Sequence, residues 1–257
     1  MKKRIEDFTV VSNIRINPRH YVLKLKAPKP LPEMFPGQFA EVLVTQAKSA
    51  FLRRPLSIHN VDYKQNTINF LVQIVGEGTL GLGSIKEGDQ LNIMYPLGNS
   101  YKLPLDKKDI LLAGGGCGVA PLLFLARYLY ENGFNPTTLI GGKTEEDLLE
   151  PDEYKKFGKV LLISEDGAAD EKGMLTDHSI FNSSQPLFSK IFTCGPEPMM
   201  KALARYARSH DIECEVSLEN TMACGIGACL CCVVETTTGN RCACTEGPVF
   251  NINELTW

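Results

Sequence analysis

Six of the nine cysteines lie close together near the C-terminal end of the chain, at a spacing that could bind a metal. Cys224, Cys229 and Cys232 form the pattern C-x4-C-x2-C, which is typical of plant-type [2Fe-2S] sites. Such a site needs a fourth thiolate, and the sequence offers Cys242 and Cys244 for it. The spacing therefore predicts an iron–sulfur centre, which relays one electron at a time.

Glycines between the first two cysteines support this interpretation. Gly225 and Gly227 can adopt backbone angles that are closed to other residues, so the backbone amides can fold over a cluster and donate hydrogen bonds to its sulfurs. A structural zinc site, the second interpretation, would prefer two separate C-x2-C pairs. Disulfides do not suit an odd number of cysteines without a signal peptide, and buried free thiols would need no such spacing.

Composition and charge exclude several classes of protein. The 257 residues include 44% hydrophobic and 22% charged residues, with a net charge of -3. These values indicate a folded globular protein and give no basic surface for nucleic acid. No stretch approaches the roughly 20 apolar residues of a membrane-spanning helix, and no apolar run follows the basic start of the chain. We therefore expect a cytoplasmic, reducing environment, which suits thiolate ligands.

The elements that must position a redox site begin with short apolar runs in the first third of the chain. They alternate partly and are separated by proline, glycine and asparagine turns, which predicts an antiparallel barrel or sandwich. The predicted strands cover residues 8–12, 20–26, 39–44 and 67–75.

Two candidate anion-binding motifs lie in this first third. Arg54-Pro55-Leu56-Ser57 leads from a loop into a strand, where an arginine fork could grip a diphosphate and the serine hydroxyl could reach a ring or phosphate oxygen. About twenty residues later, Gly76-Glu77-Gly78-Thr79 opens a predicted short helix over residues 79–85. Each motif alone is also compatible with an ordinary surface turn, but together they favour one shared cofactor.

The middle third has the pattern of a nucleotide-binding α/β unit. A buried strand at residues 109–113 is followed by Gly114-Gly-Gly-Cys-Gly-Val-Ala-Pro121 and a predicted helix over 122–130. A glycine loop between strand and helix places backbone amides against a pyrophosphate. The loop reads G-G-x-G-x-x-P, and Pro121 suits the first helical turn.

Further strands and helices alternate after this loop, which predicts a doubly wound parallel sheet. The predicted strands are 137–140, 160–163 and 190–193, and the predicted helices are 144–149 and 197–210. Cys194-Gly195-Pro196 follows the last of these strands, at the edge where open α/β sheets bind ligands. Cys194 could lie beside a nicotinamide there, although Cys194 and Cys117 are also compatible with small residues at tight turns.

Taken in order, these motifs resemble the ferredoxin-NADP reductase superfamily over nearly the whole chain. Within it, Ser217-Leu-Glu219, Met222-Ala-Cys-Gly-Ile-Gly-Ala-Cys229 and Cys244-Thr-Glu-Gly-Pro-Val-Phe250 resemble the electron-transfer subunits of dihydroorotate dehydrogenase B. This resemblance implies Cys224, Cys229, Cys232 and Cys244 as the cluster ligands and leaves Cys231 and Cys242 as spare thiols. It also implies three domains: a β-barrel FAD domain over 1–102, an α/β doubly wound NAD domain over 103–212 and a small [2Fe-2S] domain over 213–257.

The resemblance further implies which residues bind FAD and NAD. The FAD residues would be Arg54, Pro55, Leu56, Ser57, Leu71, Val72, Gln73, Gly78 and Thr79. The NAD residues would be Gly115, Gly116, Gly118, Pro121, Cys194, Gly195 and Pro196. Since the chemistry belongs to the cofactors, we expect no acid or base among the histidines His20, His59, His178 and His210.

The implied function is electron transfer between an FMN-containing dihydroorotate dehydrogenase catalytic subunit and NAD, in a heterotetramer of two plus two chains that serves pyrimidine synthesis. Electrons would pass from FMN through the cluster to FAD and then to NAD as a hydride. An alternative within the same superfamily is a reductase subunit serving a ferredoxin, a hydrogenase or an oxygenase. A colourless zinc-stabilised binding module is the alternative from another class.

Overall fold

The computed structural model describes residues 3–47, 50–104, 109–183 and 185–257. The chain forms two compact units. The first unit contains Met1–Ser100, Asn220–Val234 and Asn240–Pro248, and the second contains Tyr101–Glu219, Glu235–Gly239 and Val249–Trp257. The C-terminal residues thus contribute to both units, and the division into three domains stays a prediction.

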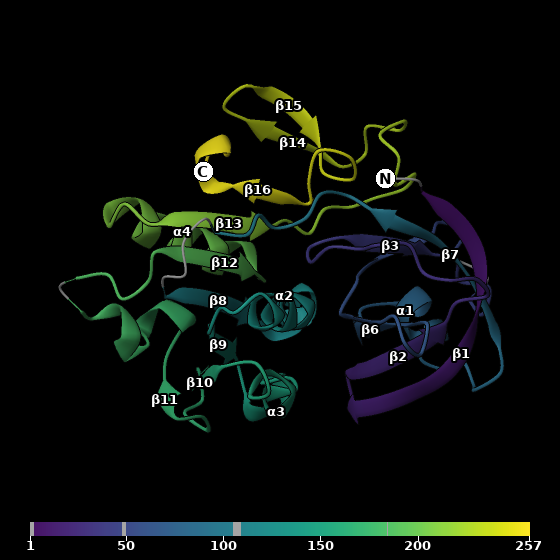
Figure 1. Cartoon of the computed structure of the whole chain (residues 1–257), viewed down its shortest axis with the longest axis horizontal. Helices are drawn as coiled ribbons and strands as arrows, with labels where there is room; N and C mark the ends of the chain where they lie inside the picture. Colours follow the sequence, from purple (N-terminus) through teal and green to yellow (C-terminus); the bar gives the residue numbers. More distant parts are fainter. Residues whose placement is uncertain (1–2, 48–49, 105–108, 184) are drawn as a thin grey trace. The chain divides into compact units, whose positions relative to one another are not determined.

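The first unit is built on an antiparallel sheet with the strand order β4-β3-β7-β1-β2-β6-β5. The sheet curls so that β4 also approaches β6, which confirms the expected antiparallel β-barrel domain (Figure 1). Its strands are β1 (Arg4–Asn17), β2 (His20–Lys26), β3 (Phe39–Val42), β4 (Arg54–Ser57), β5 (Asn60–Asp62), β6 (Thr67–Gln73) and β7 (Gln90–Leu97). One short helix, α1 (Glu77–Leu82), follows β6.

Alternation of side chains explains why this sheet has one buried face. In β2, Leu23 and Leu25 are completely buried, and the residues between and beside them are partly exposed. The register places Leu23 opposite Phe70 and Leu25 opposite Ile68 on β6, and both partners are also completely buried. Because successive side chains of a strand point to opposite faces, this register joins the apolar sets of two strands into one core.

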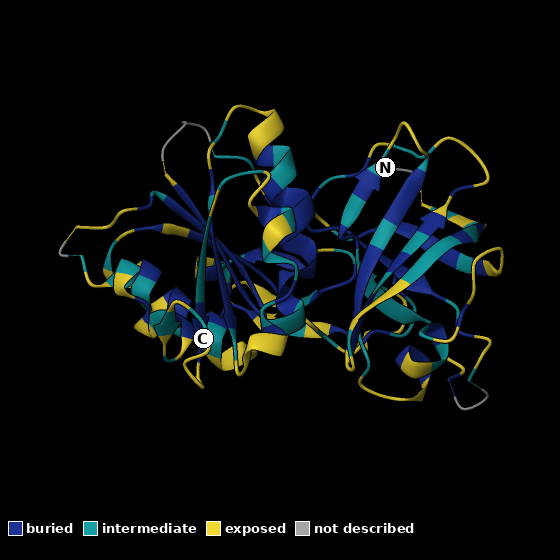
Figure 2. Cartoon of the chain, turned by 90° about the horizontal axis from the view of Figure 1, so that it is seen from below, coloured by how far each residue is buried: buried dark blue, intermediate teal, exposed yellow. Residues whose placement is uncertain are grey.

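The second unit is a mostly parallel sheet with the order β11-β10-β9-β8-β12-β13-β16. Its strands are β8 (Ile110–Gly115), β9 (Thr137–Gly142), β10 (Lys159–Ser164), β11 (Glu171–Lys172), β12 (Lys190–Cys194), β13 (Glu213–Ser217) and β16 (Val249–Asn251). The helices are α2 (Ala120–Glu131), α3 (Pro151–Tyr154) and α4 (Glu197–Ser209). This order confirms the doubly wound α/β domain. The central strands of this unit are dark blue, and therefore buried, in Figure 2.

Two features of the second unit differ from the sequence prediction. The expected helix over residues 144–149 is only a single 3-10 turn, η2 (Glu145–Asp147). The Thr144 and Asp147 side chains cap the N-terminal end of this turn in a capping box, and the backbone leaves the helical region at Leu148. In addition, β16 joins the sheet antiparallel to β13, with Val216 opposite Phe250. This pairing joins strands that are far apart in the sequence, so no local pattern predicts it.

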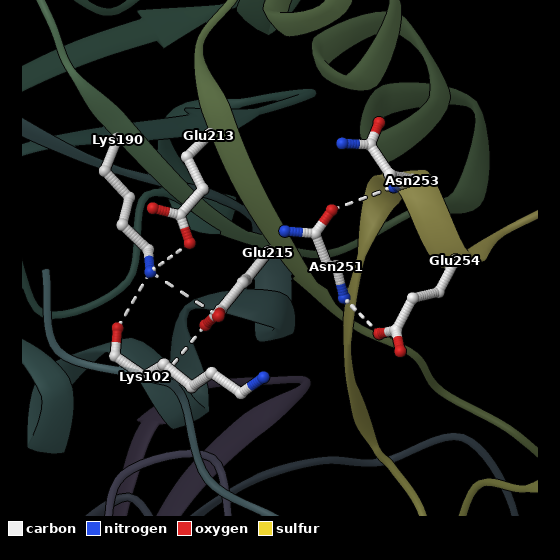
Figure 3. Close-up of polar contacts among 7 residues, drawn as sticks. All are labelled: Lys102, Lys190, Glu213, Glu215, Asn251, Asn253 and Glu254. Carbon is white, nitrogen blue, oxygen red and sulfur yellow. Dashed lines mark hydrogen bonds and ion pairs between the residues drawn. The ribbon is translucent and has the colours of Figure 1, made fainter.

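A buried ion network holds the backbone of Lys102 against the second sheet (Figure 3). The Lys190 ammonium is only 2% exposed and donates to Glu213 Oε1 at 2.7 Å and to the Lys102 carbonyl at 2.9 Å. Glu215 Oε1 lies 3.5 Å from the same ammonium, and its other oxygen accepts from the Lys102 amide at 2.9 Å. A single buried cation thus fixes the chain where it enters this unit.

The remaining elements are a two-stranded hairpin, β14 (Val233–Thr236) with β15 (Gly239–Cys242), and short 3-10 turns. The turns are η1 (Gly116–Val119), η2, η3 (Leu175–Asp177), η4 (Ser179–Phe181) and η5 (Ile252–Glu254). Within the described ranges, no helix has both the length and the apolar character needed to cross a membrane.

Candidate functional site

The loop from Cys224 to Cys229, here called the cluster loop, directs its backbone amides at sulfur. The Cys224 Sγ accepts from the amides of Ile226 at 3.5 Å, Ala228 at 3.3 Å and Cys229 at 3.4 Å. Gly225 and Gly227 both have positive φ, at 65° and 79°. Both therefore adopt the left-handed backbone conformation that favours glycine, as the sequence predicts. These donors favour a thiolate, and that of Ile226 is the main reason why the pKa of Cys224 falls to about 6.

The two predicted ligands outside this loop, Cys232 and Cys244, follow it in the sequence and share hydrogen bonds with it and with each other. The Gly227 amide donates to Cys244 Sγ at 3.2 Å, and the Cys244 amide donates to Cys232 Sγ at 3.4 Å. Cys232 and Cys244 are buried, whereas Cys229 is exposed. Donation of N–H groups to four ligand sulfurs is the environment that an iron–sulfur cluster requires, so the donor set fits such a cluster.

The two spare thiols occupy different surroundings. Cys231 is exposed and its amide donates to Cys229 Sγ at 3.5 Å. Cys242 is buried beside Cys232, and its amide is engaged by Glu246 Oε2 at 2.9 Å. Within the described part of the chain, no three potential ligand side chains already converge on a metal position. The ligand set therefore stays a prediction.

A buried acid lies directly under the cluster loop, and the sequence analysis did not single it out. A β-carbon built on Gly225 would stand 2.8 Å from Glu41 Cγ and 3.0 Å from both Leu97 Cδ1 and Met94 Cε. Glu41 is completely buried on β3. Burial raises the pKa of its carboxyl to about 7, an effect that Arg53 opposes. The only signal in the sequence is one acid within the apolar run of residues 39–44.

The predicted FAD motifs lie together in the first unit. Arg54, Pro55, Leu56 and Ser57 form the whole of β4 and are half-buried. A β-carbon on Gly78 would stand 2.6 Å from Arg54 Nε, so the arginine motif and the glycine motif share one place. Leu71, Val72 and Gln73 end β6, the strand that β4 approaches. The structure therefore brings the predicted FAD residues together.

The neighbouring Arg53 and Arg54 have different roles. Arg53 donates to the Glu41 carbonyl at 3.3 Å and to Asn92 Oδ1 at 2.5 Å, which fastens β3 to β7. Among the residues that the structure describes, Arg54 Nη1 donates only to carbonyls of its own loop, at Leu52 and Arg53. Arg54 is therefore the better candidate for a phosphate, whereas Arg53 is structural.

Thr79 has a local structural role at the start of α1. Its Oγ1 accepts from the amides of Val75 at 2.9 Å and Gly76 at 3.3 Å, and it donates to the Gly76 carbonyl at 3.2 Å. The hydroxyl thus closes the start of α1. Its role toward FAD stays a prediction.

The predicted NAD residues meet where the strand order of the second sheet reverses, between β8 and β12. Gly114 lies opposite Cys194 in the parallel register. A β-carbon on Gly118 would overlap Gly195 and stand 2.5 Å from the Cys194 carbonyl oxygen. One on Gly115 would stand 3.0 Å from Pro196 Cδ. Crevices at such reversal points are where open α/β sheets bind nucleotides.

Two further residues complete this loop cluster. Gly116 has φ of 53° and open space around its α-carbon, and Pro121 lies in the first turn of α2. The loop thus leaves space at Gly116, and helix α2 starts shortly after it. This is the geometry expected for a pyrophosphate at the start of a twelve-residue helix.

Cys194 is almost completely buried, with 1% of its surface exposed. Burial raises the pKa of this thiol well above its ordinary value, and the carboxylate of Glu219 adds to that rise. The Ser217 side chain hydrogen-bonds to Cys194. Burial also raises the pKa of Glu219. Ser217 and Glu219 therefore belong with the predicted nucleotide site, although the sequence analysis quoted them only for the family resemblance.

Comparison with protein families identifies the C-terminal part of the chain. Residues 219–256 match a family model described as the iron-sulfur cluster binding domain of dihydroorotate dehydrogenase B. Residues 224–244, which contain the predicted ligands, lie inside this match.

Whole-chain comparisons agree with that match. The electron transfer subunit of dihydroorotate dehydrogenase B (NAD(+)) from Fusobacterium nucleatum subsp. nucleatum is 36% identical, over 98% of each chain. The subunit of the same name from Shouchella clausii is 34% identical, over 99% of each chain. The structure of an NADH-dependent reduced ferredoxin-NADP oxidoreductase has a TM-score of 0.87 at 30% identity, covering 97% of this chain and 90% of that one.

Proposed function

Because the chain belongs to the family of electron-transfer subunits of dihydroorotate dehydrogenase B, we propose that it carries electrons between a catalytic partner subunit and NAD. The observation that carries this proposal is the similarity along the full length of two curated subunits. A shared fold alone would not suffice, because one fold serves many functions.

FAD is assigned to the first unit. Arg54 supplies the guanidinium for the diphosphate, and the backbone at Gly78 leaves room for that side chain. Ser57 and the end of β6 from Leu71 to Gln73 complete the site. When bound, FAD can exchange a hydride with NAD and single electrons with a [2Fe-2S] cluster, so it joins two-electron to one-electron chemistry.

The second unit binds NAD as a substrate. The glycine loop at 115–118 offers backbone amides to the pyrophosphate, and Pro121 starts the helix behind it. Gly195 has φ of 148° and lets the chain pass close to Gly118. Cys194 and Pro196 border the same crevice. None of these residues needs to act as an acid or base, since the transferred hydride carries no separate proton.

The cluster loop, together with Cys232 and Cys244, holds the [2Fe-2S] group through the sulfurs of Cys224, Cys229, Cys232 and Cys244. Its amides stabilise the thiolates, as the bonds to Cys224 and Cys244 illustrate. The exposed position of Cys229 leaves one side of the site accessible to electrons from outside the chain. A short distance to the partner is needed there, because single electrons must pass from the partner to the cluster.

The partner is an FMN-containing catalytic subunit that oxidises dihydroorotate, in a complex of two plus two chains. Residues 220–234 carry no charged side chain. Ile226, Leu230 and Val233 in this segment are 50%, 63% and 37% exposed. An uncharged apolar surface beside the cluster suits a lasting subunit interface better than a transient encounter. The chain would act in the cytoplasm, in pyrimidine synthesis.

A second candidate function has one observation in its favour. The NADH-dependent reduced ferredoxin-NADP oxidoreductase matches this chain closely in structure and at 30% identity. A reductase subunit that serves a ferredoxin would use the same three cofactor sites and differ only in its partner.

The test is to co-express the chain with candidate catalytic subunits and to purify the complex through a tag on this chain. Absorption spectra are then recorded before and after addition of dihydroorotate and of NAD+. We expect dihydroorotate to bleach the flavin and cluster bands and NADH to appear afterwards. Bleaching by NADH but never by dihydroorotate would exclude the pyrimidine function and favour the second candidate.

A further inference from the structure

Glu41 is buried in an environment that offers its carboxylate no hydrogen-bond donor. It is 0% exposed, and neither Oε1 nor Oε2 has a hydrogen-bond partner among the residues that the structure describes. The nearest arginine, Arg53, uses its guanidinium on the carbonyls of Glu41 and Asn92 and on the Asn92 side chain. A cation is therefore close to the acid, but its donors are aimed elsewhere.

The strand register places this acid on the face that meets the cluster loop. Glu41 lies opposite Met94 on β7 and opposite Pro55 on β4. The side chains of Glu41, Met94 and Leu97 form the floor on which Gly225 rests, since each would lie within 3.0 Å of a β-carbon there. Gly225 directly follows Cys224, so the acid lies beneath the first predicted cluster ligand.

Packing alone does not account for an acid at this position. A buried polar group without a partner destabilises the fold, and a charged one does so more strongly. Met94 and Leu97 show that the same floor accepts apolar side chains, and a leucine or methionine at position 41 would bury without that cost. An acid that weakens the fold and lies beside a predicted redox centre is a candidate for a functional role.

We propose that Glu41 is a positioning residue of the iron–sulfur site, which supports the cluster loop from below and lowers the reduction potential of the cluster. This inference rests on the proposed function, since it requires that the loop holds a [2Fe-2S] group. The physical reason is electrostatic: reduction adds one negative charge, and a carboxylate in a poorly solvated position opposes it. Net charge around a cluster is one of the factors that set its potential.

The test compares the full chain with the variants Glu41→Gln and Glu41→Leu. Iron content is measured first, and the cluster is then titrated with reductant while its electron paramagnetic resonance signal is followed, at a pH well above neutrality. We expect both variants to bind iron like the wild type and to have a higher midpoint potential. Thermal unfolding of Glu41→Leu should occur at the same temperature as that of the wild type or higher.

A matched control is Glu87→Gln, which removes an exposed charge from the same unit and should leave the potential unchanged. An unchanged or lower potential in Glu41→Gln would overturn the inference, and so would a shift of equal size in the control. A wild-type chain that binds no iron would instead contradict the proposed function. Glu41→Gln keeps the shape of the side chain, so the test does not depend on whether Glu41→Leu folds.

Discussion

Gly118 packs so closely against Gly195 that the two loops of the nucleotide crevice leave no room for a side chain between them. A β-carbon on Gly118 would overlap the α-carbon of Gly195 and stand 2.5 Å from the carbonyl oxygen of Cys194. The contact joins the glycine loop after β8 to the end of β12. It therefore sets the width of the crevice in which NAD is expected to bind.

Replacing Gly118 by alanine should damage this crevice. Because the neighbouring atoms are backbone, they cannot move aside easily, and overpacking of this kind costs about 1–3 kcal/mol. We expect Gly118→Ala to lower the free energy of unfolding by that amount and to weaken NADH binding at least tenfold. Chemical denaturation and titration of flavin reduction by NADH measure the two effects.

Gly88→Ala is the control outside the predicted cofactor sites, because Gly88 has open space for a β-carbon and only its φ of 89° is unfavourable for alanine. It should cost about 1 kcal/mol through backbone strain and leave NADH binding nearly unchanged. Equal losses of NADH affinity in both variants would show that the Gly118 contact does not shape the crevice.

Because Gly78 contacts Arg54, we expect replacement of either residue to cause a selective loss of FAD. A β-carbon at Gly78 would push the Arg54 guanidinium away, since Nε lies 2.6 Å from that position. We expect Gly78→Ala and Arg54→Ala to be purified with less than a tenth of the wild-type FAD, as measured by flavin fluorescence after denaturation. Gly76→Ala, with nothing within 4 Å, should retain its FAD. Full FAD content in Arg54→Ala would show that this arginine is not needed for FAD binding.

Cysteine replacements test the ligand set. The Cys244 sulfur accepts a hydrogen bond from the Gly227 amide, whereas none of the described cluster-loop amides donates to the Cys242 sulfur, and the Cys242 amide itself donates to Glu246 Oε2. We expect Cys244→Ser to lose most of its iron and sulfide, and Cys242→Ser and Cys231→Ser to retain both. Iron and sulfide analysis of the purified variants decides the matter. Iron loss in Cys242→Ser with retention in Cys244→Ser would exchange the two assignments.

Lys190 should be essential for the stability of the second unit. Its removal leaves Glu215 buried without its cation, and breaking a buried ion pair from one side costs about 3–5 kcal/mol. We expect Lys190→Met to lower the free energy of unfolding by about 3 kcal/mol, the lower end of this range. The loss should not be larger, because Glu213 is half-exposed and water can solvate its charge. Lys155→Met, which breaks an exposed pair with Asp152, is the control and should change nothing measurable.

Thiol labelling should report the raised pKa of Cys214. Burial raises the pKa of this thiol to about 12, and only the thiolate reacts with iodoacetamide. Between neutral pH and moderately alkaline pH the folded thiol stays protonated, so its labelling should remain negligible, whereas in the unfolded chain labelling should rise with pH. Exposed Cys231 should react rapidly in the folded protein and serves as the internal control. Mass spectrometry of peptides distinguishes the two, and rapid native labelling of Cys214 would contradict its burial.

Local sequence patterns were sufficient to predict both sheets and most of their elements. Alternation in residues 20–26 predicted β2 with the bounds that the structure shows, because strand periodicity and burial on one face are properties of the segment itself. The cysteine spacing likewise predicted a loop whose amides point at sulfur. The helix expected over 144–149 was wrong, because the backbone leaves the helical region at Leu148 after a single 3-10 turn.

Only the tertiary structure decided which distant residues meet. It placed Arg54 against Gly78, Gly118 against Gly195 and β16 beside β13. It also revealed Glu41 beneath the cluster loop, where the sequence showed only one acid in an apolar strand. The physical reason is that cofactor motifs are short and act through their own backbone geometry, so they can be recognised from a short stretch of sequence. Burial, charge pairing and close packing depend on what the fold brings from elsewhere in the chain, and no local pattern contains that information.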